Sequence, residues 1–373
     1  MFFARPHLIA AAALLAAGAA QAQSLSSVTL YGSLDQYLNA MRSSSGATIK
    51  SVEDGAYLRS RFGVRGLEDL GGGLSAKFQM EGGFSADNGT QADGSRFWDR
   101  QAWVGLASKD YGELRIGRQN GPIQTRGGYI DHTARTLGSV INNFGVPSRY
   151  DNDVSYLSPR LAGVQVELHA ALPESASGNR AMVYQWALDY VADAYRLGYL
   201  GLRGRPQAGA TVDRNVVYDN LYANWMGEKT TVYLAYVHSN NNTATAVSNN
   251  AGTILGNVGG VNAGTNADLH NFYNIVQLSA DYKLTPQLRL GALVGRIADQ
   301  SHRDRGANGA ALTAYYDLSK RTMLLGQVET LRNDSAGGWR PAGSAGLKDN
   351  FSQAADINGR TISGVQLGIV HRF

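Results

Sequence analysis

The feature that most constrains this chain is a two-residue alternation of apolar and polar side chains that recurs in segment after segment. Residues 58–65 show it most clearly, because three arginines lie on one face and bulky apolar groups lie on the other. Successive side chains of a strand point to opposite faces. The pattern therefore predicts sheets with one wet face and one apolar face. The arginines are Arg59, Arg61 and Arg65, and the apolar residues are Leu58, Phe62 and Val64.

This alternation predicts sixteen strands, separated by connections that are alternately short and long. An even number of strands, with every short turn at one end, is typical of bacterial outer-membrane barrels. We therefore expect an all-β fold, a sixteen-stranded antiparallel transmembrane β-barrel with short periplasmic turns and long extracellular loops. The predicted strands are 27–39, 57–69, 73–85, 96–108, 111–119, 151–158, 162–172, 181–193, 194–204, 215–226, 230–239, 270–283, 286–299, 308–319, 321–332 and 359–373.

The N-terminal residues predict export from the cytoplasm. Arg5 precedes an apolar stretch over residues 8–20, and a small-x-small cleavage pattern ends at Ala22. This is a secretory signal, too short to span a bilayer. We expect a signal peptide over residues 1–22 and the barrel domain over residues 23–373. The absence of cysteine excludes disulfides and thiolate metal sites. The 45 Gly and 19 Tyr with only 8 Pro favour many short strands.

One connection, residues 120–150, is unusually long and has no strand period. Loops of this length inside a compact fold are usually functional or disordered. Disorder does not suit this segment, because it contains bulky apolar residues such as Ile123, Ile130, Val140 and Phe144. These side chains need a surface to lie on. In a hollow barrel that surface is the inner wall, so we expect the loop to fold inward and to narrow the channel.

Aromatic residues collect near the predicted strand ends, where an interfacial girdle would lie. The last segment, residues 365–373, alternates up to a terminal phenylalanine, which indicates that a sheet closes there. The girdle candidates are Tyr111, Trp225, Tyr233, Tyr282, Tyr315 and Phe373.

With these residues in view, the chain resembles the Gram-negative general porins of the beta-proteobacterial type. Each matching motif is weak alone, but six in the same order are specific. They are residues 28–32 (VTLYG), 60–71 (SRFGVRGLEDLG), 100–106 (RQAWVGL), 111–119 (YGELRIGRQ), 152–156 (NDVSY) and the Phe373 ending.

The resemblance implies an outer-membrane homotrimer whose third extracellular loop, here residues 120–150, is inserted into each channel. It also implies contacts with outer-membrane lipid and lipopolysaccharide, and recognition by the barrel-assembly machinery through Phe373. The solutes would be small ions and hydrophilic molecules that diffuse passively, and no cofactor is expected. The net charge of +4 is too small to indicate nucleic-acid binding.

By the same resemblance, arginines of the barrel wall face the inserted loop at the constriction. Motif by motif, this role falls on Arg61, Arg100 and Arg149, with Arg59 and Arg65 as further pore-lining candidates. Arg61 lies on the polar face of its strand. Arg100 shares a face with Ala102 and Val104, which predicts that Trp103 points at lipid. The direction of Arg149 is not fixed by alternation.

The loop departs from the family pattern in its charges. Relatives commonly carry a Pro-Glu-Phe-Gly element and a second carboxylate opposite the arginines, whereas this chain has Asn142-Asn-Phe-Gly145. Asp131 is the only carboxylate between residues 120 and 150, against Arg126, Arg135 and Arg149. Charges of one sign in a narrow passage concentrate the counter-ion. We therefore expect the constriction to contain these residues and to prefer anions.

Other functions find less support in the sequence. The six histidines that follow the signal show no metal-ligand spacing and no His-Glu-x-x-His, and no Gly-x-Ser-x-Gly elbow is present. We therefore expect neither an enzyme nor a metal site. A substrate-specific outer-membrane channel is the main alternative, and it would need an aromatic slide or a binding ladder along the lumen. The histidines are His132, His169, His238, His270, His302 and His371.

Overall fold

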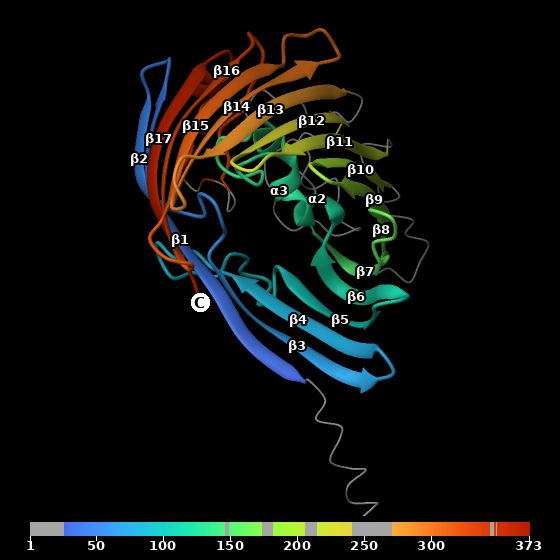
Figure 1. Ribbon diagram of the computed structural model, residues 1–373. Helices are drawn as coiled ribbons and strands as arrows, with labels where there is room; N and C mark the ends of the chain where they lie inside the picture. Colours follow the sequence, from blue (N-terminus) through green and yellow to red (C-terminus); the bar gives the residue numbers. More distant parts are fainter. Residues whose placement is uncertain are drawn as a thin grey trace, which may run out of the picture.

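The strands form one continuous antiparallel sheet that closes on itself. In the computed structural model, which describes residues 26–145, 149–173, 182–205, 215–240, 271–343, 347 and 349–373, the first strand pairs with the last from Ser33–Arg372 to Ser43–Ile362. This closure confirms the predicted antiparallel β-barrel (Figure 1). The predicted signal peptide, residues 1–22, lies outside the described residues.

Sixteen of the strands agree with the predicted ones to within five residues at each end, whereas β2 was not predicted. The strands are β1 (Ser27–Ser43), β2 (Thr48–Asp54), β3 (Arg61–Gly71), β4 (Leu74–Gly83), β5 (Gln101–Ser108), β6 (Gly112–Asn120), β7 (Arg149–Leu157), β8 (Val164–Ala171), β9 (Val183–Ala192), β10 (Tyr195–Gly204), β11 (Val216–Met226), β12 (Thr230–Ser239), β13 (Tyr273–Lys283), β14 (Leu288–Asp299), β15 (Ala307–Asp317), β16 (Thr322–Asn333) and β17 (Thr361–Arg372).

The sheet has 17 strand segments but sixteen strand positions in the wall. One edge of β1 pairs with β17, and its other edge pairs with β3 over residues 27–33 and with β2 over residues 36–42. The strands β2 and β3 therefore share one position in the wall, separated by residues 55–60. The predicted strand over residues 57–69 was wrong at its start, because the ladder with β1 begins only at Arg61.

The alternation predicted from the sequence sorts the wall into an outer and an inner face. Large apolar residues such as Leu30, Val104 and Leu312 are 60–65% exposed on the outside. Inward-facing positions such as Asp35 and Gln277 are polar and buried. No helix among the described residues is long and apolar enough to cross a membrane.

The aromatic girdle was predicted correctly only in part. Tyr111, Trp225, Tyr282 and Phe373 are 43–80% exposed at strand ends, as expected. Tyr233 and Tyr315 are instead 9% and 4% exposed and point inward, so assigning them to the girdle was wrong. The two groups differ because Tyr233 and Tyr315 occupy inward-facing positions of their strands. The Tyr233 hydroxyl donates to Asp281, and the Tyr315 ring lies 5.3 Å from that of Tyr57.

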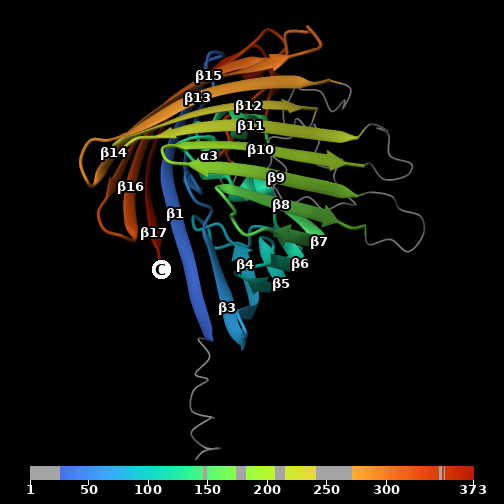
Figure 2. The same ribbon diagram turned by 45° about the vertical axis from the view of Figure 1, so that its right-hand side comes forward.

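Short and long connections alternate, which places all the short turns at one end of the barrel. The tightest turn joins β3 to β4 through Gly71, Gly72 and Gly73, whose φ angles of 82°, 60° and 82° favour glycine. Each strand from β8 to β13 lies beside its sequence neighbour (Figure 2). The long connection after β6 carries three short helices, α2 (Pro122–Thr125), α3 (Gly127–Ile130) and α4 (Val140–Phe144), and the last long loop carries α5 (Ala354–Ile357).

Candidate functional site

The inserted loop lies inside the barrel and packs against the inner wall. Helices α2, α3 and α4 contact β9, β11 and β14 respectively, and Figure 1 shows α2 and α3 within the ring of strands. The loop's apolar side chains are at most 1% exposed, because they share a cluster with inward-facing residues of β8–β16. The sequence prediction of an inserted loop is confirmed. These side chains are Ile123, Ile130, Val140, Ile141 and Phe144.

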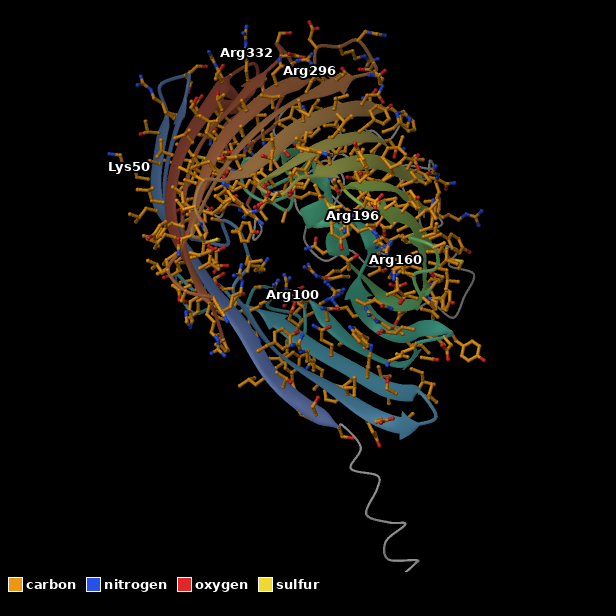
Figure 3. The ribbon with its side chains drawn as sticks, viewed as in Figure 1. Lys50, Arg100, Arg160, Arg196, Arg296 and Arg332 are labelled. Carbon is orange, nitrogen blue, oxygen red and sulfur yellow. The ribbon has the colours of Figure 1, made fainter. Side chains whose placement is uncertain are left out.

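Arginines gather on the wall segment formed by β3–β7. Arg100 Nε lies 2.6 Å from one carboxylate oxygen of Glu81, and Arg61 Nε lies 3.6 Å from the other. Arg149 Nε donates to Asn120 Oδ1 at 2.7 Å. The structure thus brings Arg61 and Arg100 around one carboxylate, with Arg149 beside them at the start of β7. Figure 3 shows the Arg100 side chain at the inner side of the wall.

Arg100 lies at the inner side of the wall (Figure 3), but strand alternation is not what directs it there. Arg100 lies one residue before β5, so strand alternation does not fix its direction. Within β5, Trp103 is 8% exposed whereas Val104 is 60% exposed, so Trp103 points into the barrel and not at lipid. The register agrees, because Trp103 pairs with the inward-facing Gln79. The prediction for Trp103 failed because it took the phase of the strand from Arg100, which lies outside the regular strand.

Residues 55–60 leave the wall and fold toward the lumen. Leu58, which the alternation placed on the apolar outer face, instead packs inside the barrel against a buried cluster that includes Tyr37, Leu137 and Tyr315. Arg59 lies close to Arg100, and burial, reinforced by the charge of Arg100, lowers its pKa. Arg59 is therefore placed beside the other arginines by a bend, and not by the strand phase that the sequence suggested.

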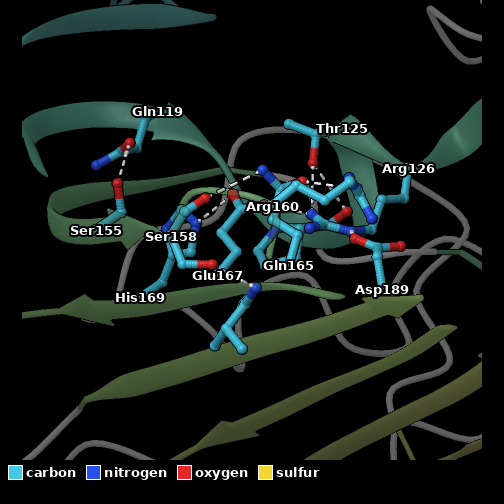
Figure 4. Close-up of polar contacts among 12 residues, drawn as sticks. Gln119, Thr125, Arg126, Ser155, Ser158, Arg160, Gln165, Glu167, His169 and Asp189 are labelled. Carbon is cyan, nitrogen blue, oxygen red and sulfur yellow. Dashed lines mark hydrogen bonds and ion pairs between the residues drawn. The ribbon is translucent and has the colours of Figure 1, made fainter. Parts of the chain in front are cut away.

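The charged residues of the inserted loop bind the wall. Arg126 lies between α2 and α3. Its Nε atom is 2.5 Å from Asp189 Oδ2, and its Nη1 atom forms an ion pair with Glu167 (Figure 4). Glu167 also contacts His169 Nε2 at 2.8 Å, and His169 Nδ1 lies 2.6 Å from Asp153. Arg126 thus binds carboxylates of β8 and β9, and His169 joins Glu167 to Asp153 of β7. These contacts fix the start of the loop to the wall.

Asp131 is fully buried and organises the turn between α3 and α4. Its Oδ1 accepts from the backbone amides of Thr133 and Arg135, and its Oδ2 accepts from Ser139 and Gln277. Arg135 is 4% exposed and donates to Gln124 at 3.3 Å. Asp131, Arg126 and Arg135 therefore all lie behind the loop surface. A direct role for them at the constriction stays a prediction.

The Asn142–Gly145 element meets another loop, and not the arginines. Asn142 Nδ2 donates to the Ala342 carbonyl at 2.6 Å, and the Ala342 amide donates to Asn143 Oδ1 at 2.9 Å. The Phe144 ring lies 5.3 Å from that of Trp339, which is fully buried. The loop between β16 and β17 therefore supports α4 from the extracellular side. Sequence reasoning missed this contact, although an apolar Trp in a glycine-rich loop was a usable signal.

Glu81 is the residue at this site that the sequence analysis did not single out. It shares the inward face of β4 with Lys77 and Gln79, so its direction was available from the alternation. Glu81 pairs with Gly63 of β3, so its carboxylate reaches Arg61 diagonally. This placement depends on the register, which the sequence does not give. Among the described residues, no group of three His, Asp or Glu side chains is arranged to hold a metal ion.

Comparisons with known proteins agree with this architecture. Residues 9–336 match the Gram-negative porin family. The chain is 28% identical to outer membrane porin protein 32 of Delftia acidovorans over 99% of its own length and 100% of that protein. It is 38% identical to an outer membrane porin of Bordetella pertussis, but over 42% of its own length and 45% of that protein. The fold resembles a solved structure described as an anion-selective porin from Comamonas acidovorans. The TM-score is 0.74 and the identity is 21%, with 93% of this chain and 100% of that chain covered.

Proposed function

The chain belongs to the Gram-negative porin family, and from that premise we propose that it is a water-filled outer-membrane channel through which small hydrophilic solutes diffuse passively, with a preference for anions. Membership of this family places the protein in the outer membrane. The observation that supports the anion preference is the gathering of Arg61, Arg100 and Arg149 on the wall that includes Glu81.

The attraction of an anion to a single arginine is large enough to affect permeation. An anion about 6 Å from one guanidinium gains roughly 3 kcal/mol at an effective dielectric near 20, before screening. Salt screens charges over about 8 Å at physiological ionic strength, so a narrow passage remains within reach of the arginines. Arg126 adds little to this field, because Glu167 and Asp189 pair with it. The wall arginines therefore contribute more to the selectivity than Arg126 does.

Reversal potentials in planar bilayers test the proposal. Across a potassium chloride gradient, we expect a potential of the sign that chloride permeation produces. Replacing Arg61 and Arg100 by glutamine together should bring this potential toward zero, while unitary channels persist. A cation-selective wild type would overturn the anion preference but not the channel function.

The same premise supports a homotrimeric assembly in contact with outer-membrane lipid and lipopolysaccharide, and recognition of Phe373 by the barrel-assembly machinery. Leu30, Val104 and Leu312 belong to the outer apolar face that such contacts require. Chemical crosslinking of the protein in native membranes would test the assembly, because a trimer gives a ladder that ends at three copies. A ladder that ends at one copy would contradict it.

A further inference from the structure

A second basic cluster lies in the lumen, closer to the short turns than the constriction. Arg65 follows Arg61 by four residues on β3, which corresponds to about 13 Å along a strand. Lys77 on β4 and Arg115 on β6 both pair with Gly105 of β5, so their side chains face the same side of the sheet. Both lie further from the constriction than Glu81 does. The cluster is therefore separate from the arginines around Glu81.

Aromatic rings hold the two guanidinium groups of this cluster. The Arg115 Cζ atom lies 4.4 Å from the centroid of the Trp103 ring, and Arg65 Cζ lies 5.4 Å from that of Tyr31. A guanidinium stacked on a ring keeps its N–H groups in one plane, so it can bind a planar anion with less loss of side-chain entropy. The hydroxyl of Tyr31 also donates to Glu81 at 2.9 Å, which links the cluster to the constriction.

The charge of the cluster is only partly neutralised. Glu113 lies 2.8 Å from Lys77 Nζ and 2.5 Å from Arg115 Nε, and it is shared between the two. No acidic side chain among the described residues lies within ion-pair distance of Arg65. Three cations therefore face one carboxylate, and the guanidinium of Arg65 is left to bind a solute.

The cluster borders a cavity of about 400 Å³. This volume is within the range of small-molecule sites, which are commonly lined by apolar and aromatic groups with a few placed polar ones. Trp103 and Leu67 supply apolar surface, while Thr29 and Gln79 supply polar groups between the cations. A ligand that suits this cavity carries a planar anionic head and a compact apolar body.

We propose that this cavity is a binding site for small organic carboxylates on the periplasmic side of the constriction. A carboxylate accepts paired hydrogen bonds from a guanidinium fork, and charge-assisted bonds of this kind are the stronger ones. The body of the acid lies against Trp103 and Leu67. The proposal rests on the channel function, since the solute reaches the cavity through the lumen.

Block of ion current by sodium benzoate tests the site. Benzoate added to the periplasmic side of single channels in chloride electrolyte should reduce the current in a saturable way. The double variant Arg65→Gln with Arg115→Gln should raise the half-blocking concentration by about tenfold, the equivalent of one charge-assisted hydrogen bond. Arg160→Gln is the matched control, because Arg160 is an exposed arginine that binds Gly163 and Gln165 in a short turn. The Arg160→Gln channel should have the same half-blocking benzoate concentration as the wild type.

The remaining outcomes separate this site from the proposed function. Unitary conductance without benzoate reports that the double variant is folded. An unchanged half-blocking concentration in that variant overturns the site, whereas a retained anionic reversal potential leaves the channel function standing. Inorganic phosphate that blocks as strongly as benzoate would overturn the assignment to organic carboxylates, because phosphate has no body to contact Trp103.

Discussion

At the scale of single residues, the charge of the constriction depends on Glu81 as much as on the arginines. Its two oxygens contact Arg100 and Arg61 at 2.6 and 3.6 Å, so it offsets part of the positive field that a passing anion meets. The carboxylate also orders these side chains. Its removal therefore changes both the net charge and the freedom of the arginines.

We predict that Glu81→Gln increases the anion preference. The amide keeps the volume and can still accept a hydrogen bond, while one negative charge is lost. The ratio of chloride to potassium permeability, obtained from reversal potentials, should rise by about threefold or more at low salt. Asp110→Asn is the control for a lost carboxylate, since Asp110 is an exposed residue of the turn between β5 and β6. A lower permeability ratio in Glu81→Gln would contradict the assignment.

Alternation alone predicted some of these residues and not others. Arg61 and Arg65 could be predicted, because both lie within a regular strand that pairs with β1. Arg59 and Arg100 could not be oriented this way, since each lies just outside a strand. The grouping of arginines around Glu81 depends on which residues lie opposite one another across neighbouring strands. A one-residue change of register would separate them, and no local pattern in the sequence specifies it.

At the scale of elements, Arg126 fixes the inserted loop to the wall. Its side chain is 4% exposed and is held by Glu167 and Asp189, from β8 and β9. A buried carboxylate whose cationic partner is removed is costly, by about 3–5 kcal/mol. The loop packing through Ile123 and Ile130 remains, so a variant at this position loosens the loop without removing its apolar anchor.

We predict that Arg126→Gln gives channels whose current fluctuates between levels. The loop then moves relative to the arginine wall, and the open-channel noise should rise severalfold over that of the wild type. Single-channel recording measures the noise, and the temperature of the near-ultraviolet circular dichroism transition reports the stability. The Arg160→Gln variant should match the wild type in both. Quiet channels in Arg126→Gln would show that the apolar packing alone holds the loop.

The sequence predicted that the loop is inserted into the barrel. It did not predict which residues hold the loop on its extracellular side. Its apolar residues required a surface, and the inner wall was the only one that a barrel offers. The hydrogen bond from Asn142 to Ala342 joins residues 200 positions apart, so no pattern within the loop indicates it. The side chains of the Asn142–Gly145 element therefore bind the outer loop and present no carboxylate to the arginines.

At the scale of the whole molecule, most of the described strands pair with their neighbours in sequence, and the ladder of β1 with β17 joins the first described strand to the last. Until it forms, the sheet has two edges whose backbone groups must find other partners. Gly32 and Phe373 form two backbone hydrogen bonds of 3.1 Å at the short-turn end of this contact. Closure therefore depends on a tight approach at one glycine.

We predict that Gly32→Ala weakens the closed barrel. A Cβ atom at Gly32 would lie 2.7 Å from the Arg61 carbonyl oxygen and 2.3 Å from the Phe373 ring, so the backbone of β3 must move away and the Phe373 ring must turn aside. Overpacking of this kind costs about 1–3 kcal/mol. The denaturant midpoint should fall, and less protein should show the heat-dependent gel mobility of a closed barrel. Gly94→Ala is the matched control, because no heavy atom lies within 4 Å of the added Cβ. Equal midpoints for the two variants would mean that the last strand adapts without cost, and that closure is held by the remainder of the β1–β17 ladder.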